Sequence, residues 1–326
     1  MSSYKRTAII ILILSLMLTG CSPGYTRHRY DFFDTFDTLT TVTGYTQTKT
    51  EFDRFADIIH DEMKRLHRLF DIYNDYESIN NLKYINDNAG VAPIKVDEDI
   101  IALLELAKTA YDTSGGAVNV ALGSVLRIWS SYREKGLRNP QNARLPDIDE
   151  LRAAAVHTKI DEIIIDNTAS TVFLRDPYMS LDVGALAKGY ALRSAMEIAI
   201  AAGFDSGIIS SGGDIITVGT PMDGRTHWSV GIRGSDGDIY DIIQITGGMS
   251  VASSGNYERF FKVNDLAYGH IIDPQTLMPA QHFGAVSVLH PDSAIAEMLS
   301  TALFILPKDQ GQALVELWNA EAIWIN

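Results

Sequence analysis

The chain has 326 residues, of which 46% are hydrophobic and 21% charged, a composition typical of a globular protein with one large domain or two modest ones. Its formal charge is −14 and it has no basic stripe, which excludes nucleic acid as a partner. The lack of a polybasic segment also means that any membrane contact would have to come from acyl chains. An anionic ligand must be bound locally against this charge, which favours a divalent cation in its site.

The first residues form a distinct segment. It opens with Lys5-Arg6, continues with an apolar run at residues 8–17 that is short for a membrane span, and ends in Leu18-Thr19-Gly20-Cys21. It resembles a bacterial lipoprotein signal peptide with its lipobox, and Cys21, the only cysteine, stands where the lipid would be attached. The alternative is a secretory signal that ends at a cysteine by chance. Removal of residues 1–20 takes away two basic residues and no acidic one, so the formal charge changes from −14 to −16.

This resemblance gives the expected organisation. Residues 1–20 are expected to be the signal peptide, residues 21–30 a tether after lipidated Cys21, and residues 31–326 the folded domain. The lipid would hold the domain at a bacterial cell membrane, on the extracytoplasmic side.

Hydrophobic periodicity predicts mainly helices in the first half of the domain. The exception is residues 31–46, where apolar and polar residues alternate as in a strand pair. The expected helices are residues 51–69, a helix capped by Asp97 and stopped at Ser114-Gly115-Gly116, residues 118–129, and a short helix opened by Asp149, with residues 139–146 as a loop and residues 86–90 as a polar turn.

The second half is predicted to be rich in strands. The expected strands, separated by glycine-containing turns, are residues 172–174, 207–210, 215–218, 228–232 and 239–245. A strong amphipathic helix over residues 293–305 precedes a last segment at residues 310–318. Helices that cluster early and strands that cluster late favour an α+β fold over a doubly wound sheet.

Two separated segments carry the chemistry. In the run Leu181-Asp182-Val183-Gly184-Ala185-Leu186-Ala187-Lys188-Gly189-Tyr190, a helix that begins near Ala185 would offer free backbone N–H groups to a phosphate, with Lys188 one turn in. The run Gly269-His270-Ile271-Ile272-Asp273-Pro274 adds an imidazole and a carboxylate. The alternative is that the glycines only allow close packing, Lys188 is a surface lysine and His270 is a core or surface histidine.

A third segment has the spacing of a cation site. Glu297 and Thr301 are four residues apart on a predicted helix, so a carboxylate and a hydroxyl share one face and can bind one hard cation. The alternative is a solvent-facing acid and a threonine that only lines the helix.

Four motifs together resemble the ApbE family of FAD:protein FMN transferases, over about residues 31–318. In chain order they are Gly115 to Gly123, Asp182 to Tyr190, Ser253 to Arg259, and Gly269 to Pro274 followed by Ala296 to Ala302. The resemblance implies an α+β fold of mixed, mostly antiparallel sheets packed with helices, with an FAD site in a cleft between them.

The resemblance also implies the site residues. FAD contacts fall on Leu39, Tyr73, Ala117, Val118, Asn119, Asp182, Lys188 and Ile271; Mg²⁺ contacts on the Ala185 carbonyl, Glu297 and Thr301; and catalysis on His270, with Asp273 as a second candidate. Asp273 either orients His270 or only caps the turn before Pro274. The chain departs from the family pattern in places: Glu297 replaces the usual Asp, Asn119 replaces an acid, and Leu39 stands where Met is typical.

The function that the resemblance implies is Mg²⁺-dependent transfer of FMN from FAD to a threonine hydroxyl of a target flavoprotein, with release of AMP. The implied acceptors are exported or membrane redox proteins such as subunits of sodium-translocating NADH:quinone oxidoreductase or Rnf-type complexes. A metal-dependent FAD pyrophosphatase and a non-catalytic FAD-binding lipoprotein remain as alternatives.

Overall fold

A computed structural model describes residues 24–256 and 259–326. The predicted signal peptide and Cys21 lie outside the described residues. The expected tether is shorter than residues 21–30, because strand β1 already begins at Thr26 and pairs with β2. No helix within the described ranges is both long and apolar enough to cross a bilayer.

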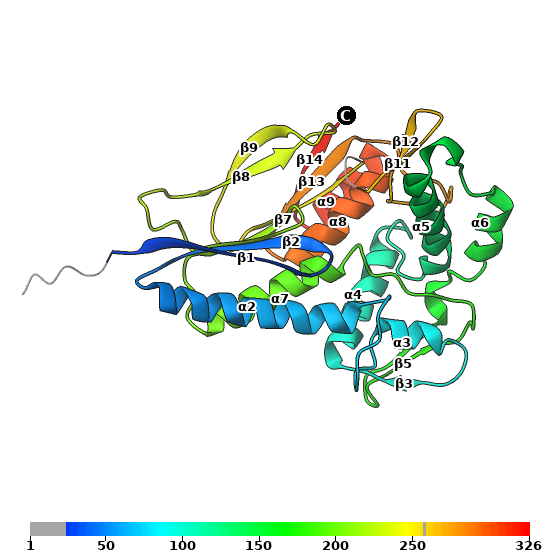
Figure 1. Ribbon diagram of the computed structural model, residues 1–326, viewed down its shortest axis with the longest axis horizontal. Coiled ribbons are helices and arrows are strands. Elements are labelled where there is room, and N and C mark those ends of the chain that lie inside the picture. Colours follow the sequence, from blue (N-terminus) through cyan, green and yellow to red (C-terminus); the bar gives the residue numbers. More distant parts are fainter. Residues whose placement is uncertain (1–23, 257–258) are drawn as a thin grey trace, which may run out of the picture.

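A seven-stranded antiparallel sheet forms the centre of the fold (Figure 1). Its strands in spatial order are β1 (Thr26–Thr35), β2 (Thr38–Thr46), β6 (Gly207–Ser211), β7 (Asp214–Val218), β10 (Ser250–Gly255), β13 (Ala285–His290) and β14 (Glu321–Ile325). Helices cover one face, and a two-stranded ribbon of β8 (Trp228–Arg233) and β9 (Ile239–Ile245) covers part of the other. The predicted α+β class with mainly antiparallel sheets is confirmed.

Three long helices pack on the first face. They are α2 (Lys49–Phe70), α7 (Ala187–Ala201) and α8 (Ser293–Ile305), and their apolar sides form the main core with the sheet. Helix α2 is capped by the Thr48 hydroxyl, which accepts a hydrogen bond from the N–H of Glu51. Gly189 allows α7 and α8 to approach closely, because a Cβ there would lie 2.3 Å from the carbonyl oxygen of Ser293.

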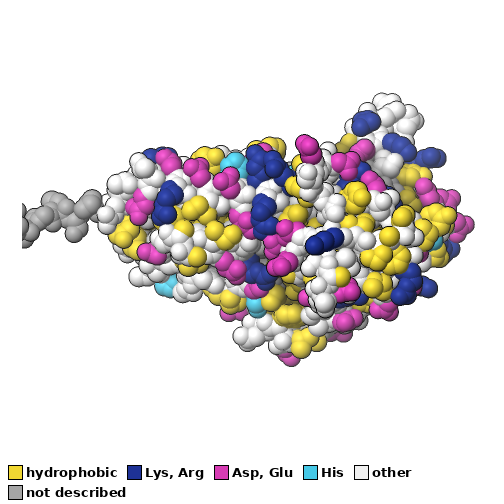
Figure 2. Space-filling view, turned by 90° about the horizontal axis from the view of Figure 1, so that it is seen from below, with side chains coloured by type: hydrophobic (Ala, Val, Ile, Leu, Met, Phe, Trp, Pro, Cys, Tyr) yellow, Lys and Arg dark blue, Asp and Glu magenta, His cyan; other side chains and the backbone are white. Residues whose placement is uncertain are grey.

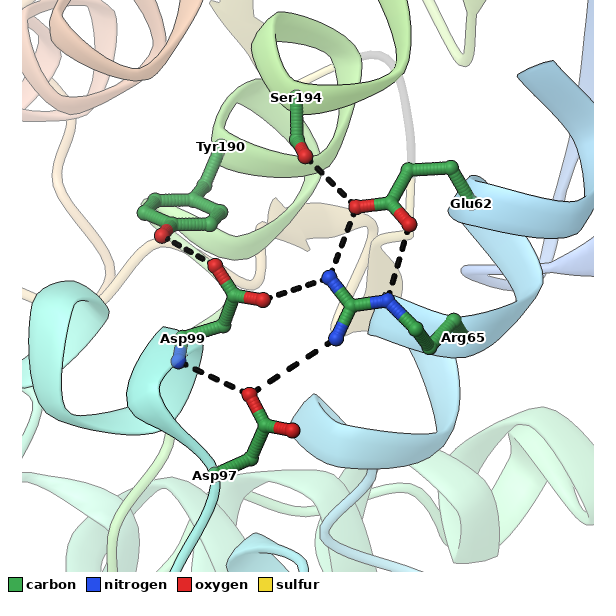
Figure 3. A network of polar contacts seen from close by, with 6 residues as sticks. All are labelled: Glu62, Arg65, Asp97, Asp99, Tyr190 and Ser194. Carbon is green, nitrogen blue, oxygen red and sulfur yellow. Dashed lines mark hydrogen bonds and ion pairs between the residues drawn. The ribbon is translucent and has the colours of Figure 1, made fainter. Parts of the chain in front are cut away.

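A polar network fixes α7 against α2 and the start of α4 (Figure 3). Arg65 on α2 binds Glu62 at 2.8 Å and both Asp97 and Asp99 at the N-terminus of α4 (Glu98–Thr113). The hydroxyl of Tyr190 on α7 donates to Asp99 at 2.7 Å. Since Tyr190 ends the run that begins at Asp182, the network fixes the helix that carries Lys188.

The remaining elements lie outside the seven-stranded sheet. They are α3 (Leu82–Asp87), β3 (Ile94–Lys95), α5 (Gly123–Arg138), the short turns η1 (Pro140–Asn142) and η2 (Ile160–Glu162), α6 (Ile148–Ala155), β4 (Ile163–Asp166), β5 (Thr171–Leu174), β11 (Phe261–Val263), β12 (Leu266–Tyr268) and α9 (Lys308–Leu317). Among them, β3, β5 and β4 form a separate three-stranded sheet. Figure 2 looks onto the side of α2 and β3–β5, where Lys and Arg side chains alternate with Asp and Glu. Lys64 of α2 forms an ion pair with Asp34 of β1.

Several expected boundaries were wrong, for local reasons. The helix predicted at residues 118–129 begins only at Gly123, because the Asn119 amide folds the preceding segment into a loop by accepting from the N–H of Ala121. Residues 82–87 form α3, which overlaps the turn predicted at residues 86–90. The short helix after the 139–146 loop is capped by Asp147 rather than opened by Asp149.

Candidate active site

A cavity of about 360 Å³ lies at the end of the sheet where α2, α5, α7 and α8 meet. Segments far apart in the sequence line it: the β1–β2 turn, residues 70–73 after α2, the loop before α5, residues 182–188, the β6–β7 turn, β10, residues 269–272 and one side of α8. The predicted site residues that line this cavity are Tyr73, Ala117, Val118, Asn119, Asp182, Ala185, Lys188, His270, Ile271, Glu297 and Thr301.

The centre of the cavity carries an ion cluster. The ammonium of Lys188 lies 3.1 Å from Oε1 of Glu297 and also pairs with Asp214, the first residue of β7. The side chains of Glu297 and Asp214 are only 7% and 3% exposed. Two buried carboxylates and one ammonium leave a net negative charge, which suits the binding of a further cation.

The N-terminus of α7 differs from the prediction. The helix begins at Ala187 rather than near Ala185, and Oε2 of Glu297 accepts a hydrogen bond of 2.7 Å from the N–H of Gly189. One of the N–H groups that the sequence suggested for binding a phosphate therefore already donates a hydrogen bond to a carboxylate of the protein. Lys188, the other group of this turn that the sequence suggested for a phosphate, contacts Glu297 and Asp214.

Asp182 lies in the turn before α7. Its Oδ1 accepts a hydrogen bond of 3.0 Å from the N–H of Gly184, and its own N–H donates to the carbonyl of Val120. Burial raises the pKa of Asp182, against the opposing effects of the Gly184 hydrogen bond and of Arg259 and Arg133. The turn thus holds Asp182 in the wall of the cavity that Ala117 and Val118 also line.

His270 is a half-buried histidine in the cavity wall. Burial, together with the nearby positive charges of Arg259 and Arg133, lowers its pKa from 6.5 to about 4. Its Nδ1 is buried and has no hydrogen-bond partner among the described residues. At neutral pH the ring is therefore uncharged and able to accept a proton from a bound hydroxyl.

Two predicted residues lie apart from the cavity wall. Leu39 is 49% exposed on β2, and its backbone carbonyl accepts from the N–H of Gly212. The carboxylate of Asp273 accepts from the N–H of Gln275 at 2.8 Å and from the hydroxyl of Thr276 at 2.9 Å. These contacts show that Asp273 caps the turn that begins at Pro274. Of the two roles considered for Asp273, orienting His270 or capping a turn, they match the second.

Sequence reasoning missed several charged residues of the cavity, among them Asp214 and Arg133. Asp214 directly follows the Gly212-Gly213 turn. The sequence analysis used these glycines only to separate two strands. An acidic residue directly after such a turn is the sequence feature that could have indicated Asp214. Arg133 lies on the inner side of α5, and burial followed by repulsion from Arg259 lowers its pKa. Nothing in the sequence around it distinguishes Arg133 from a surface arginine.

Comparison with known proteins decides the family. The ApbE family model matches residues 36–324, nearly the whole described chain. The chain belongs to the ApbE family. A FAD:protein FMN transferase of Treponema pallidum is 34% identical over 260 residues, covering 75% of this chain and 70% of its own length. One of Klebsiella pneumoniae is 30% identical over 276 residues, covering 82% and 83%.

Solved ApbE structures share the fold. The ApbE protein of Thermotoga maritima superposes with a TM-score of 0.79 at 27% identity, covering 92% of this chain and 94% of its own. The apo flavinyl transferase ApbE of Pseudomonas stutzeri has a TM-score of 0.76 at 22% identity, covering 92% and 91%. The four ApbE motifs of this chain thus lie on an ApbE fold, and residues of all four motifs line the cavity.

Proposed function

We propose that this protein is a FAD:protein FMN transferase that moves the FMN moiety of FAD to a threonine hydroxyl of an acceptor protein and releases AMP. Membership of the ApbE family, with relatives of that name, supports the activity. The observation that carries it for this chain is His270, an uncharged imidazole in the wall of the cavity that Lys188 also lines, whose buried Nδ1 has no hydrogen-bond partner among the described residues.

The residues present fit a magnesium ion. Glu297 and Thr301 both line the cavity from α8, and Ala185 lines it from the segment before α7. These are oxygen donors, which Mg²⁺ prefers. Within the described ranges no three His, Cys, Asp or Glu side chains gather as a metal cluster, so a carboxylate, a hydroxyl and a carbonyl would form the protein's share. When bound, Mg²⁺ would withdraw negative charge from the pyrophosphate oxygens.

The chemical step then needs few groups from the chain. The threonine oxygen forms a bond to the phosphorus of the FMN unit, and the bond from that phosphorus to the bridging oxygen of AMP breaks. His270 accepts the proton of the threonine hydroxyl, and the ammonium of Lys188 offsets charge on the phosphate oxygens. Asp182, Tyr73, Ala117, Val118 and Ile271 form the part of the wall that would hold the flavin nucleotide.

The acceptor and the location are parts of the same proposal. The Cys21 lipid would hold the enzyme at the cell membrane on its extracytoplasmic side, and the acceptors would be exported or membrane redox proteins, such as subunits of sodium-translocating NADH:quinone oxidoreductase or Rnf-type complexes. What supports this is the signal-like sequence that ends at Cys21.

A single mixture tests the reaction. The protein, FAD, Mg²⁺ and an acceptor with a flavinylation threonine are incubated, and the products are read by in-gel flavin fluorescence and nucleotide chromatography. A fluorescent acceptor with equimolar AMP is the expected result. Free FMN with AMP would instead identify a pyrophosphatase, and unchanged, tightly bound FAD a non-catalytic flavin-binding protein.

A further inference from the structure

Lys188 lies between two buried carboxylates, one of which is the proposed cation ligand Glu297. Its ammonium contacts Oε1 of Glu297 at 3.1 Å and Oδ2 of Asp214. The other oxygen of each carboxylate accepts a hydrogen bond from the backbone. Glu297 accepts from the N–H of Gly189 at 2.7 Å, and Asp214 accepts from the N–H of Ser253 at 3.2 Å. Both acids are thus fixed in place, while the lysine ends a flexible chain that is 21% exposed.

The charges of this cluster set up a competition. A divalent ion on Glu297 would lie within a few ångströms of the ammonium, and like charges repel strongly in a site shielded from water. The two cations cannot both lie against Oε1 of Glu297. The ammonium therefore has to leave Glu297 when the ion binds, while Asp214 still offers it a fixed buried partner.

We propose that Lys188 is a built-in competitor for the divalent cation at Glu297, and that Asp214 is the positioning residue that keeps the displaced ammonium in the cavity, available to phosphates. The inference rests on the proposed function in one respect, that Glu297 takes the cation. It goes further by assigning Asp214 and by predicting how cation and nucleotide binding depend on each other.

The consequence is positive coupling between the two ligands. Without nucleotide, the cation must displace Lys188 and binds weakly. A pyrophosphate attracts the ammonium away from Glu297, so the cation binds more tightly when the nucleotide is present. Linkage requires that the cation raise the nucleotide affinity by the same factor.

The test measures cation binding in the absence of FAD and acceptor. Mn²⁺, which has a paramagnetic signal, is titrated into the wild type and into Lys188→Met, and free Mn²⁺ is followed by electron paramagnetic resonance. We expect Lys188→Met to bind Mn²⁺ at least about tenfold more tightly, since a like charge beside the ligand is removed. Lys83→Met is the matched control, because Lys83 also pairs with two acids, Asp75 and Asp87, but lies outside the cavity.

Further variants identify the site and the partner. The double variant Lys188→Met with Glu297→Gln should lose the gain in affinity, and Lys188→Arg, which keeps the charge, should bind Mn²⁺ as weakly as the wild type. Adding a nucleotide pyrophosphate, ADP-ribose, should tighten Mn²⁺ binding severalfold in the wild type and clearly less in Asp214→Asn, whose released ammonium lacks a buried anionic partner.

Definite results would overturn the proposal. Equal Mn²⁺ affinity in Lys188→Met and the wild type would show that Lys188 does not compete with the cation. An equal gain in affinity in Lys83→Met would show that the change in net charge alone causes the effect. A gain that persists without the Glu297 carboxylate would move the cation elsewhere. Should Lys188→Met be poorly folded without metal, the rise of its melting temperature on adding Mn²⁺ is compared instead, and a rise no larger than that of wild type contradicts the proposal. FMN transfer is assayed separately, so a failure of either assay is attributed to its own hypothesis.

Discussion

The carboxylate of Glu297 on α8 accepts a hydrogen bond of 2.7 Å from the backbone N–H of Gly189 in the first turn of α7. This contact joins the two helices that carry Lys188 and Glu297 into the cavity. It gives Glu297 two tasks: capping a helix and, in the proposed function, binding the cation. Substitutions at this position can separate them.

The first prediction concerns Glu297. Glu297→Gln keeps an oxygen for the N–H of Gly189 but loses the charge, so Mg²⁺-dependent transfer should collapse while the fold survives. Glu297→Ala should lose transfer and also about 1–3 kcal/mol of unfolding free energy, because it leaves the Gly189 N–H without this partner. Urea unfolding and a Mg²⁺ titration of transfer measure the two effects. A Glu297→Gln enzyme with unchanged Mg²⁺ dependence would remove Glu297 from the cation site.

The second prediction is that His270 serves the chemical step. His270→Ala should bind FAD nearly as well as the wild type but transfer FMN about 10² to 10⁴ times more slowly, the usual loss for a general base. FAD binding is followed by fluorescence quenching, and transfer by single-turnover kinetics at saturating FAD. Undiminished transfer by this variant would require another base.

The third prediction follows from the pKa of about 4 for His270. A base works only unprotonated, so transfer should hold constant through the ordinary histidine range and fall as the pH approaches about 4. The folded-state pKa lies below the unfolded value of 6.5, so the unfolded chain binds the extra proton. The contribution of His270 to the free energy of unfolding is therefore complete above pH 6.5 and is lost as the pH drops toward 4. Between pH 7 and pH 5 this loss is about 2 kcal/mol at most.

The control for this pH effect is His270→Gln, which cannot titrate. Urea unfolding of both proteins at the two pH values gives the difference, and the variant should lose less stability than the wild type by about the stated amount. Identical pH dependence of unfolding would show that His270 is not protected from protonation in the folded protein.

The fourth prediction tests the approach of α7 to α8. Gly189→Ala would place a Cβ 2.3 Å from the carbonyl oxygen of Ser293, a backbone atom that cannot turn aside. The variant should lose about 1–3 kcal/mol of stability even though alanine favours helices. Gly24→Ala, where a Cβ would meet nothing within 4 Å, is the neutral control. Equal thermal stability of the two variants would contradict this packing.

The fifth prediction concerns Cys21, which lies outside the described residues. If Cys21 carries the lipid, Cys21→Ser should release the protein from the membrane fraction with its activity intact. Mass spectrometry of the mature N-terminus of the wild type provides the direct test, and an unmodified cysteine in membrane-bound protein would refute the anchor.

The sequence by itself determined the elements whose causes are local. Helices α2, α4 and α8 follow from apolar spacing and from capping by Thr48, Asp97 and Asp292, all interactions between residues a few positions apart. The four motifs likewise indicated the family and most of the cavity wall. Strands β10 and β13 were missed because their burial is nearly continuous rather than alternating, so period-two patterning is absent.

Only the tertiary structure decided the charge pattern of the site. Lys188, Asp214 and Glu297 come from α7, β7 and α8, and no sequence spacing predicts that one ammonium lies between the two carboxylates. The pKa of His270 also depends on burial and on Arg133 and Arg259, which different segments bring near it. Electrostatic energies depend on distance and solvent exposure, and both are fixed only when the sheet brings these segments together.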